Sequence, residues 1–147
     1  MVSEKSLAVD AWEALFRAQV TVLRQLNSEF PTDVLSFNEY DVLFNLSRQQ
    51  GRRLRLRDLN KHLLLTQPSI SRLVDRLVER ELVTKLADPS DRRGIIVGLT
   101  DTGHDLFRRV AVIHAESIMR RVGGALSLTE LEHLTRLTDK LRLWPRA

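Results

Sequence analysis

The sequence contains no cysteine, and this absence excludes several kinds of site. A disulfide framework, a thiolate zinc site and a cysteine redox sensor all need cysteine side chains. The four histidines show no metal-ligand spacing with one another or with carboxylates, so neither a metal nor a cofactor is expected. The chain also lacks a Gly-rich phosphate loop and a credible Ser-His-Asp set, which makes an enzyme the least favoured class.

Long hydrophobic runs are absent as well. No apolar segment approaches the roughly 18 residues that span a bilayer. Residues 1–6 do not form a basic region followed by an apolar stretch, so no signal peptide is expected. We therefore expect a cytoplasmic protein without a membrane partner. With 147 residues, 43% of them hydrophobic and 29% charged, the chain can build a core and is not disordered throughout.

Positive charge is concentrated in the middle of the chain. The net charge is +4, but the segment 51–93 contains 11 basic and six acidic residues, a net charge of +5. A basic segment of this kind is expected of a protein that binds a polyanion. A solvated arginine-rich face explains the charge alone equally well, so the arrangement of predicted elements has to separate the two interpretations.

Helical periodicity predicts long helices on both sides of this segment. One covers residues 6–30, a second runs from 100 to about 122, and a third, after the Gly123-Gly124 break, begins at the capping box Ser127–Glu130. A helix of about 23 residues is about 35 Å long. A small central domain cannot cover such helices, so we expect their apolar faces to pack on each other and on a second copy of the chain.

The central segment has the pattern of two short helices followed by a hairpin. A capping box, Ser36 to Glu39, opens a helix that ends near Gln50-Gly51, and a very short strand at 53–55 and a helix at 57–63 follow. Thr66 is expected to cap the next helix, with Pro68 in its first turn.

One face of this fourth helix is apolar and the opposite face is polar. The apolar positions recur at i, i+3, i+4 and i+7 and comprise Ile70, Leu73, Val74 and Leu77. The polar side carries Ser69, Ser71, Arg72, Asp75, Arg76 and Glu79. The runs 83–86 and 95–99 are typical of strands, and the turn between them predicts a hairpin with Asp91-Arg92-Arg93 at its tip.

A helix with small polar residues and arginine on one face can enter the DNA major groove, and a basic hairpin beside it can reach the minor groove. We assign Gln67, Ser69, Ser71 and Arg72 to base edges or adjacent phosphates, and Arg92 and Arg93 to the minor groove. Arg76 is assigned to a phosphate, with an ion pair to Glu79 as an equal alternative. Asp91 is expected to support the wing by holding the direction of an arginine. The arginines at 52–57 contact the DNA backbone at most.

These residues resemble the MarR family (multiple-antibiotic-resistance regulators). The resemblance rests on the runs 56–63, 66–77 and 82–83 and on the wing, Asp91-Arg92-Arg93 followed by 97–103, and it covers nearly the whole chain. It implies a homodimer built from the first and the last two helices. It also implies a DNA-binding lobe on each subunit and a ligand cleft where the lobe meets the dimer helices. Glu81 stands where the family often has glycine.

Some members of the family place a Trp, an Asp and wing-side arginines around a planar anionic ligand. Trp12, Asp41 and Arg93 resemble that arrangement, so the candidate ligand residues are Trp12, Phe16, Tyr40, Asp41 and Phe44. An ordinary aromatic core is the simpler explanation of the same residues.

The predicted fold is mainly α with a small β-wing, a winged helix-turn-helix of six helices. Residues 1–35 form an N-terminal dimerisation helix, 36–100 the DNA-binding lobe and 101–147 the C-terminal dimerisation helices. The expected function is a sequence-specific transcriptional regulator on pseudo-palindromic double-stranded DNA, a repressor released by a small aromatic or anionic ligand. The alternative is a winged-helix interaction protein that binds a protein partner without sequence-specific DNA binding.

Overall fold

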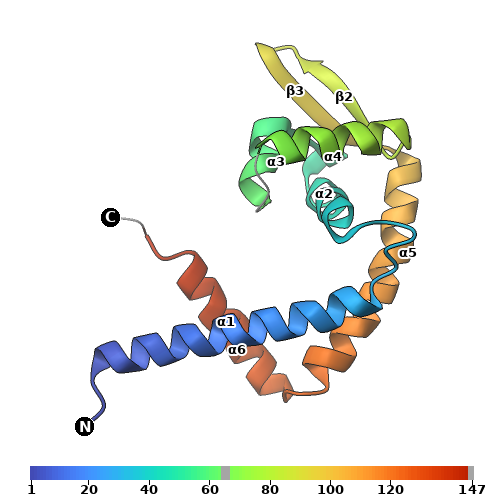
Figure 1. Cartoon of the computed structure of the whole chain (residues 1–147). Coiled ribbons are helices and arrows are strands. Elements are labelled where there is room, and N and C mark those ends of the chain that lie inside the picture. Colours follow the sequence, from blue (N-terminus) through green and yellow to red (C-terminus); the bar gives the residue numbers. More distant parts are fainter. Residues whose placement is uncertain (64–66, 146–147) are drawn as a thin grey trace. The chain divides into compact units, whose positions relative to one another are not determined.

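The computed structural model describes residues 1–63 and 67–145, which fall into two compact units (Figure 1). The winged unit is Pro31–Ile113, and the helical unit is Met1–Phe30 together with the chain from His114 onward. Thr66, the predicted cap of the fourth helix, lies outside the described residues. Among the described residues, no helix has the length and apolar character to cross a membrane.

The winged unit combines short helices with a three-stranded antiparallel sheet. Its elements are α2 (Phe37–Ser47), the 3-10 turn η1 (Gln50–Arg52), β1 (Arg53–Arg55), α3 (Leu56–His62), α4 (Gln67–Glu79), β2 (Val83–Asp88), β3 (Asp91–Leu99) and the first part of α5 (Asp101–Ile118). The strand order is β1-β3-β2. The predicted mainly α fold with a small β-wing is confirmed, including the three-residue strand that precedes α3.

The hairpin is longer than the β-rich runs alone predict. Asp88 pairs with Asp91, so the ladder continues to the turn at Pro89-Ser90. The predicted tip residues Asp91-Arg92-Arg93 follow this turn directly, and they form the first residues of β3 instead of a loop. These residues are polar, and strands are predicted from β-branched and aromatic residues, so the start of β3 was not predicted.

The core of the winged unit lies where α4 packs on α2. Ile70, Leu73, Val74 and Leu77 of α4 are buried, as are Val42, Leu43 and Leu46 of α2. The predicted capping box fixes the start of α2. The Glu39 amide donates to Ser36 Oγ over 3.0 Å, and the Ser36 amide donates to Glu39 Oε1 over 2.8 Å. These bonds satisfy amides that a helix start leaves without partners.

The C-terminal end of α4 closes in a Schellman motif. The Leu82 amide donates to the Leu77 carbonyl over 3.0 Å, and the Glu81 amide donates to the Val78 carbonyl over 2.9 Å. Glu81 takes a φ of 61° to make this turn. Glycine is usual at that position because it has no Cβ to clash in the left-handed region.

Helix α5 begins against this turn. The Thr100 hydroxyl caps it by accepting from the Gly103 amide over 2.9 Å and donates to the Glu81 carbonyl over 2.8 Å. A Cβ at Gly103 would lie 2.0 Å from the Leu82 carbonyl oxygen, so only glycine permits the approach. The start of α5 and the end of α4 are thereby held together.

The helical unit contains α1 (Glu4–Glu29), the last residues of α5, the π-helical turn η2 (Met119–Gly123) and α6 (Leu128–Arg142). The predicted capping box at Ser127–Glu130 is present at the start of α6. Glu29 accepts hydrogen bonds from Ser117, Arg121 and Arg120, in that order of effect, and they lower its pKa to about 2. This cluster ties the end of α1 to the region where α5 becomes η2.

Candidate nucleic-acid interface

The face of α4 opposite its buried stripe is open to solvent. Ser69, Arg72 and Arg76 are exposed, and Ser71 is half-buried. The helix begins at Gln67, the fourth predicted base-reading residue on this element. Buried apolar side chains hold one side of α4 while hydrogen-bonding groups occupy the other, which is the arrangement that a groove-reading helix requires.

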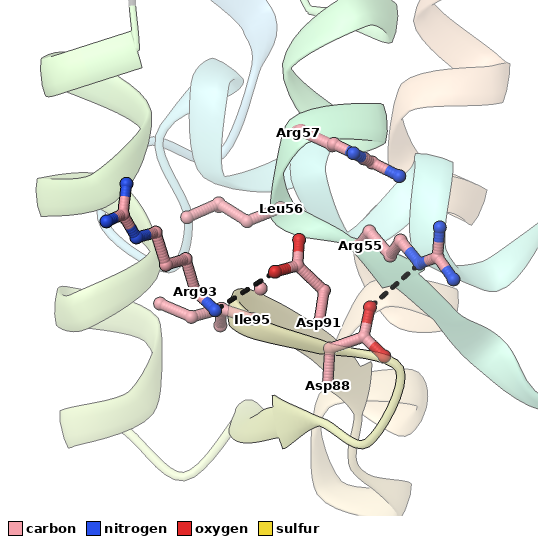
Figure 2. A pocket seen from close by; sticks show the side chains of 8 residues that line it. Arg55, Leu56, Arg57, Asp88, Asp91, Arg93 and Ile95 are labelled. Atoms are coloured by element: carbon pink, nitrogen blue, oxygen red, sulfur yellow. Dashed lines mark hydrogen bonds and ion pairs between the residues drawn. The ribbon is translucent and has the colours of Figure 1, made fainter.

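The wing presents two further cations. Arg92 and Arg93 are exposed at the start of β3. Asp91 Oδ1 accepts a hydrogen bond from the Arg93 backbone amide over 3.1 Å, and Figure 2 shows the Arg93 side chain pointing away from Arg55. Asp91 thus fixes the backbone from which the Arg93 side chain starts.

The ion pair that braces the wing involves Asp88, which the sequence interpretation missed. Its side chain is 3% exposed, and its carboxylate lies 2.9 Å from Arg55 Nε. The Ser90 amide and hydroxyl donate to Asp88 Oδ1 over 2.9 and 2.7 Å. These Ser90 hydrogen bonds, followed by the charge of Arg55, lower the pKa of Asp88. The Asp-Pro-Ser sequence locally signals the turn in which Asp88 accepts the Ser90 bonds. It gives no indication of which arginine pairs with Asp88.

A small cavity of about 160 Å³ separates the wing from the start of α3 (Figure 2). Its lining comprises Arg55, Leu56, Arg57, Asp88, Asp91, Arg93, Gly94 and Ile95. The three guanidinium groups exceed the two carboxylates, so the space between the wing and α3 has a net positive charge.

A second ion pair joins the wing to α4. Lys85 Nζ on β2 lies 2.8 Å from Asp75 Oδ1. This pair compensates the one acid in the middle of the polar side of α4 and holds the hairpin against that helix. Within the described part of the chain, Arg76 makes no ion pair with Glu79, the alternative that helix spacing had left open.

The arginines of the winged unit differ in whether they have an acidic partner. Arg52, Arg55 and Arg80 form ion pairs with Asp101, Asp88 and Glu39. Among residues 1–63 and 67–145, no acidic partner lies within ion-pair distance of the four arginines Arg72, Arg76, Arg92 and Arg93. These four are the arginines that sequence reasoning assigned to DNA. Among the described residues, the winged unit's other arginines without an ion pair are Arg48, Arg53, Arg57, Arg108 and Arg109, which lie outside α4 and the start of β3.

The predicted ligand residues belong to two separate clusters. In the helical unit, the rings of Trp12 and Phe16 have centroids 5.7 Å apart. In the winged unit, Tyr40 and Phe44 stack at 6.4 Å. Both Tyr40 and Phe44 also contact Phe107 of α5, at 5.3 and 6.3 Å. Phe107 was not predicted, although it belongs to the apolar stripe of its helix.

Asp41 lies half-buried in the same unit as Tyr40 and Phe44. Burial raises its pKa, and the Asn45 amide, which donates to Asp41 Oδ1 over 3.2 Å, opposes that rise. Burial also raises the pKa of Tyr40, with a smaller contribution from the Asp41 charge. For metal binding, the residues with described positions offer no group of three or more His, Asp or Glu side chains.

Comparisons with known proteins give one consistent result. The model of the MarR family matches residues 35–94. The HTH-type transcriptional regulator MhqR of Bacillus subtilis is 28% identical over 97% of this chain and 94% of its own length. The structure of Sco3205, a MarR family regulator from Streptomyces coelicolor in complex with DNA, is 26% identical. It superposes with a TM-score of 0.80 and covers 99% of this chain and 92% of its own.

A third relative concerns control of DNA binding. BpsR of Bordetella bronchiseptica, whose structure describes regulation of DNA binding by 6-hydroxynicotinic acid, is 25% identical with a TM-score of 0.78. The match covers 90% of this chain and 98% of that one. The fold of each unit, the exposed polar face of α4 and the basic wing agree with these findings, and residues 35–94 match the MarR family of transcriptional regulators.

Proposed function

We propose that this protein is a homodimeric repressor that binds a pseudo-palindromic site in double-stranded DNA and leaves it when a small ligand binds. The observation that carries the proposal is the set of exposed arginines on α4 and at the start of β3 that have no acidic partner in the described part of the chain. Within the described residues, the arginines that brace the winged unit have acidic partners, whereas Arg72, Arg76, Arg92 and Arg93 are exposed without one. Exposed arginines without acidic partners, placed on one helix and on the adjacent hairpin, can bind the phosphates of a DNA duplex.

Each predicted contact follows from this placement. In the proposed complex, α4 enters the major groove with Gln67, Ser69, Ser71 and Arg72 at base edges or adjacent phosphates, and Arg76 at a phosphate. Arg92 and Arg93 enter the minor groove, and Asp91 supports the wing by holding the Arg93 backbone. The relative Sco3205, solved in complex with DNA, supports this use of the fold.

The exposed apolar side chains of the helical unit support a dimer. No residue of α1 or α6 is buried, although both helices are amphipathic. Trp12, Phe16, Leu137 and Leu141 are 57%, 49%, 58% and 60% exposed. Monomeric proteins rarely expose contiguous apolar patches larger than about 300–600 Å². We therefore assign these faces to a second copy of the chain.

The same unit has a groove that a second copy can fill. It is an open, mostly apolar groove of about 480 Å³ between α1 and the segment from η2 to α6, with Leu15, Val22 and Leu134 among its lining residues. A twofold pair offers the same apolar surface from each subunit. Such a pair presents two α4 helices, which must lie about 34 Å apart to enter successive major grooves.

Release follows if a ligand prefers a dimer with another spacing of the α4 helices. The ligand lowers DNA affinity by its difference in affinity for the two states. BpsR, regulated by 6-hydroxynicotinic acid, suggests a small aromatic acid as the chemical class. We propose Trp12, Phe16, Tyr40, Asp41 and Phe44 as its contacts, with rings for stacking and Asp41 for hydrogen bonding.

The test begins by selecting bound fragments from genomic DNA and titrating the recovered site by fluorescence anisotropy at several salt concentrations. We expect log K to fall by about 0.9 per neutralised phosphate for each tenfold rise in salt. Arg72→Ala should cost about 1–3 kcal/mol on the selected site and little on random DNA. Arg76→Ala should lower the salt slope by about 0.9.

Arg108→Ala is the matched control, since Arg108 is an exposed arginine of the winged unit on α5, away from α4 and the wing. It should leave both affinity and slope unchanged. Failure to enrich any DNA, or equal binding to selected and random fragments, would instead favour the protein-interaction alternative.

A further inference from the structure

The arginine directly after α4 does not face the proposed DNA surface. Arg80 follows the last residue of the helix, and its guanidinium reaches back to the start of α2. Arg80 Nη1 lies 3.1 Å from Glu39 Oε2, and Nη2 donates to the Val34 carbonyl over 2.7 Å. One side chain therefore bonds two different segments at once.

Both acceptors of Arg80 are themselves fixed. Glu39 is 13% exposed at its side chain, and its other oxygen, Oε1, closes the capping box of α2. Val34 belongs to a turn in which the Val34 and Leu35 amides both donate to the Pro31 carbonyl, over 3.0 and 3.2 Å. A planar guanidinium with two fixed acceptors is held in one orientation.

The turn that Arg80 contacts is one of the two places where the chain passes between the units. It follows Phe30, the last residue of the N-terminal part of the helical unit. The other passage is α5, which contains the boundary between Ile113 and His114. Its cap residue Thr100 bonds the Glu81 and Leu82 carbonyls directly after Arg80. Both passages are thus bonded to the C-terminal end of α4.

We infer that Arg80 is a positioning residue that sets the direction of α4 with respect to the turn at Val34, one of the two chain passages into the helical unit. The inference rests on the proposed function, because it concerns the spacing of two α4 helices in a dimer. Without the Arg80 bonds, α4 remains folded, since its apolar stripe and Schellman motif persist. What is lost is the attachment of its C-terminal end to the turn at Val34 and to Glu39, so this end of the helix samples more directions and the fraction of dimers spaced for DNA falls.

The variant that isolates this contact is Glu39→Gln. A glutamine can still close a capping box, so α2 keeps its start while the charge opposite Arg80 disappears. Arg80→Ala removes both bonds. Arg142→Ala is the matched control, because it breaks another arginine ion pair, an exposed one with Asp139, which is of the kind that contributes little.

Operator affinity and its salt dependence give the first readout. If the competent fraction falls to about a tenth, Arg80→Ala weakens binding roughly tenfold. The salt slope stays at the wild-type value because no phosphate contact is lost. Glu39→Gln gives a smaller loss in the same direction, and Arg142→Ala gives none. A decrease of the slope by about 0.9 would identify Arg80 as a phosphate contact and overturn the inference.

The second readout is the distance between the two α4 helices. The chain has no cysteine, so Glu79→Cys gives one spin label per subunit on an exposed position of α4. Pulsed dipolar spectroscopy should give a narrow distance distribution for the otherwise native dimer and a broader one when Arg80→Ala or Glu39→Gln is added. An unchanged width would refute the role of Arg80 while leaving the dimer intact. Absence of a dipolar signal in the labelled native chain would refute the proposed dimer, and this inference with it.

Discussion

Replacing Glu81 by glycine should stabilise this protein. Glu81 has a φ of 61° and closes the Schellman motif after α4. For an L-residue with a Cβ, the left-handed conformation costs about 1–2 kcal/mol. Glycine avoids that cost, and every backbone bond of the turn, including the one from Thr100 to the Glu81 carbonyl, is retained.

The gain is reduced by the unfolded state. Glycine makes the unfolded chain more flexible, which lowers stability by roughly 0.4–1 kcal/mol. Subtracting this cost from the relief of strain leaves a net gain of about 0.5–1 kcal/mol in the free energy of unfolding. For a chain of this size, 1 kcal/mol corresponds to about 2–4 °C, so the melting temperature should rise by roughly 2 °C.

The assay is urea denaturation together with a thermal scan at one fixed protein concentration, because a dimer's midpoint depends on concentration. Glu81→Ala is the control, since alanine keeps the Cβ in the left-handed region and should remain close to the native value or below it. Operator affinity should be the same for all three proteins. If Glu81→Gly and Glu81→Ala had equal stabilities, the strain argument at this turn would be refuted.

Three further predictions follow from other contacts. Gly103→Ala should lower the free energy of unfolding in urea by about 1–3 kcal/mol, because the new Cβ would collide with the Leu82 carbonyl. The pKa of Glu29 is lowered to about 2 from 4.5, so its stabilising effect is complete above pH 4.5 and is lost as the pH falls towards 2. Thermal scans between pH 2 and 6 should show this loss in the native chain and a flatter profile for Glu29→Gln. Leu137→Glu on the exposed apolar face of α6 should give monomers in sedimentation velocity, and a persistent dimer would show that this face is not the interface.

Local signals in the sequence predicted where three of the helices start. Ser36, Thr100 and Ser127 each cap the helix that follows, as their spacing indicated. A cap needs only residues within about one helical turn, so the sequence contains all the information. The buried stripe of α4 was predictable for the same reason, because its period of 3.6 residues is a property of one helix.

Contacts between distant segments were not predictable in this way. Arg55 pairs with Asp88, and Arg80 with Glu39, across long stretches of chain. The Asp88-Pro89-Ser90 sequence signals a turn, but it does not show that Asp88 pairs with an arginine, the role expected of Asp91, which instead bonds the Arg93 backbone amide. The partner of Asp88 depends on the order and register of the strands, because the pairing of β1 with β3 brings Arg55 to the hairpin.

The fold therefore shows which arginines have acidic partners, and the sequence alone does not. Spacing along α4 could not separate Arg76 from Arg80, since both follow acidic residues and both lie in a basic segment. In the structure, Arg80 has its charge compensated by Glu39, whereas within the described residues no carboxylate compensates Arg76. An arginine that is already paired must lose that pair before it binds a phosphate, but an exposed unpaired one has no such cost. Substitutions of the two arginines should consequently have different effects. Loss of Arg76 should change the salt dependence of DNA binding, whereas loss of Arg80 should change the position of α4 and leave the salt dependence unchanged.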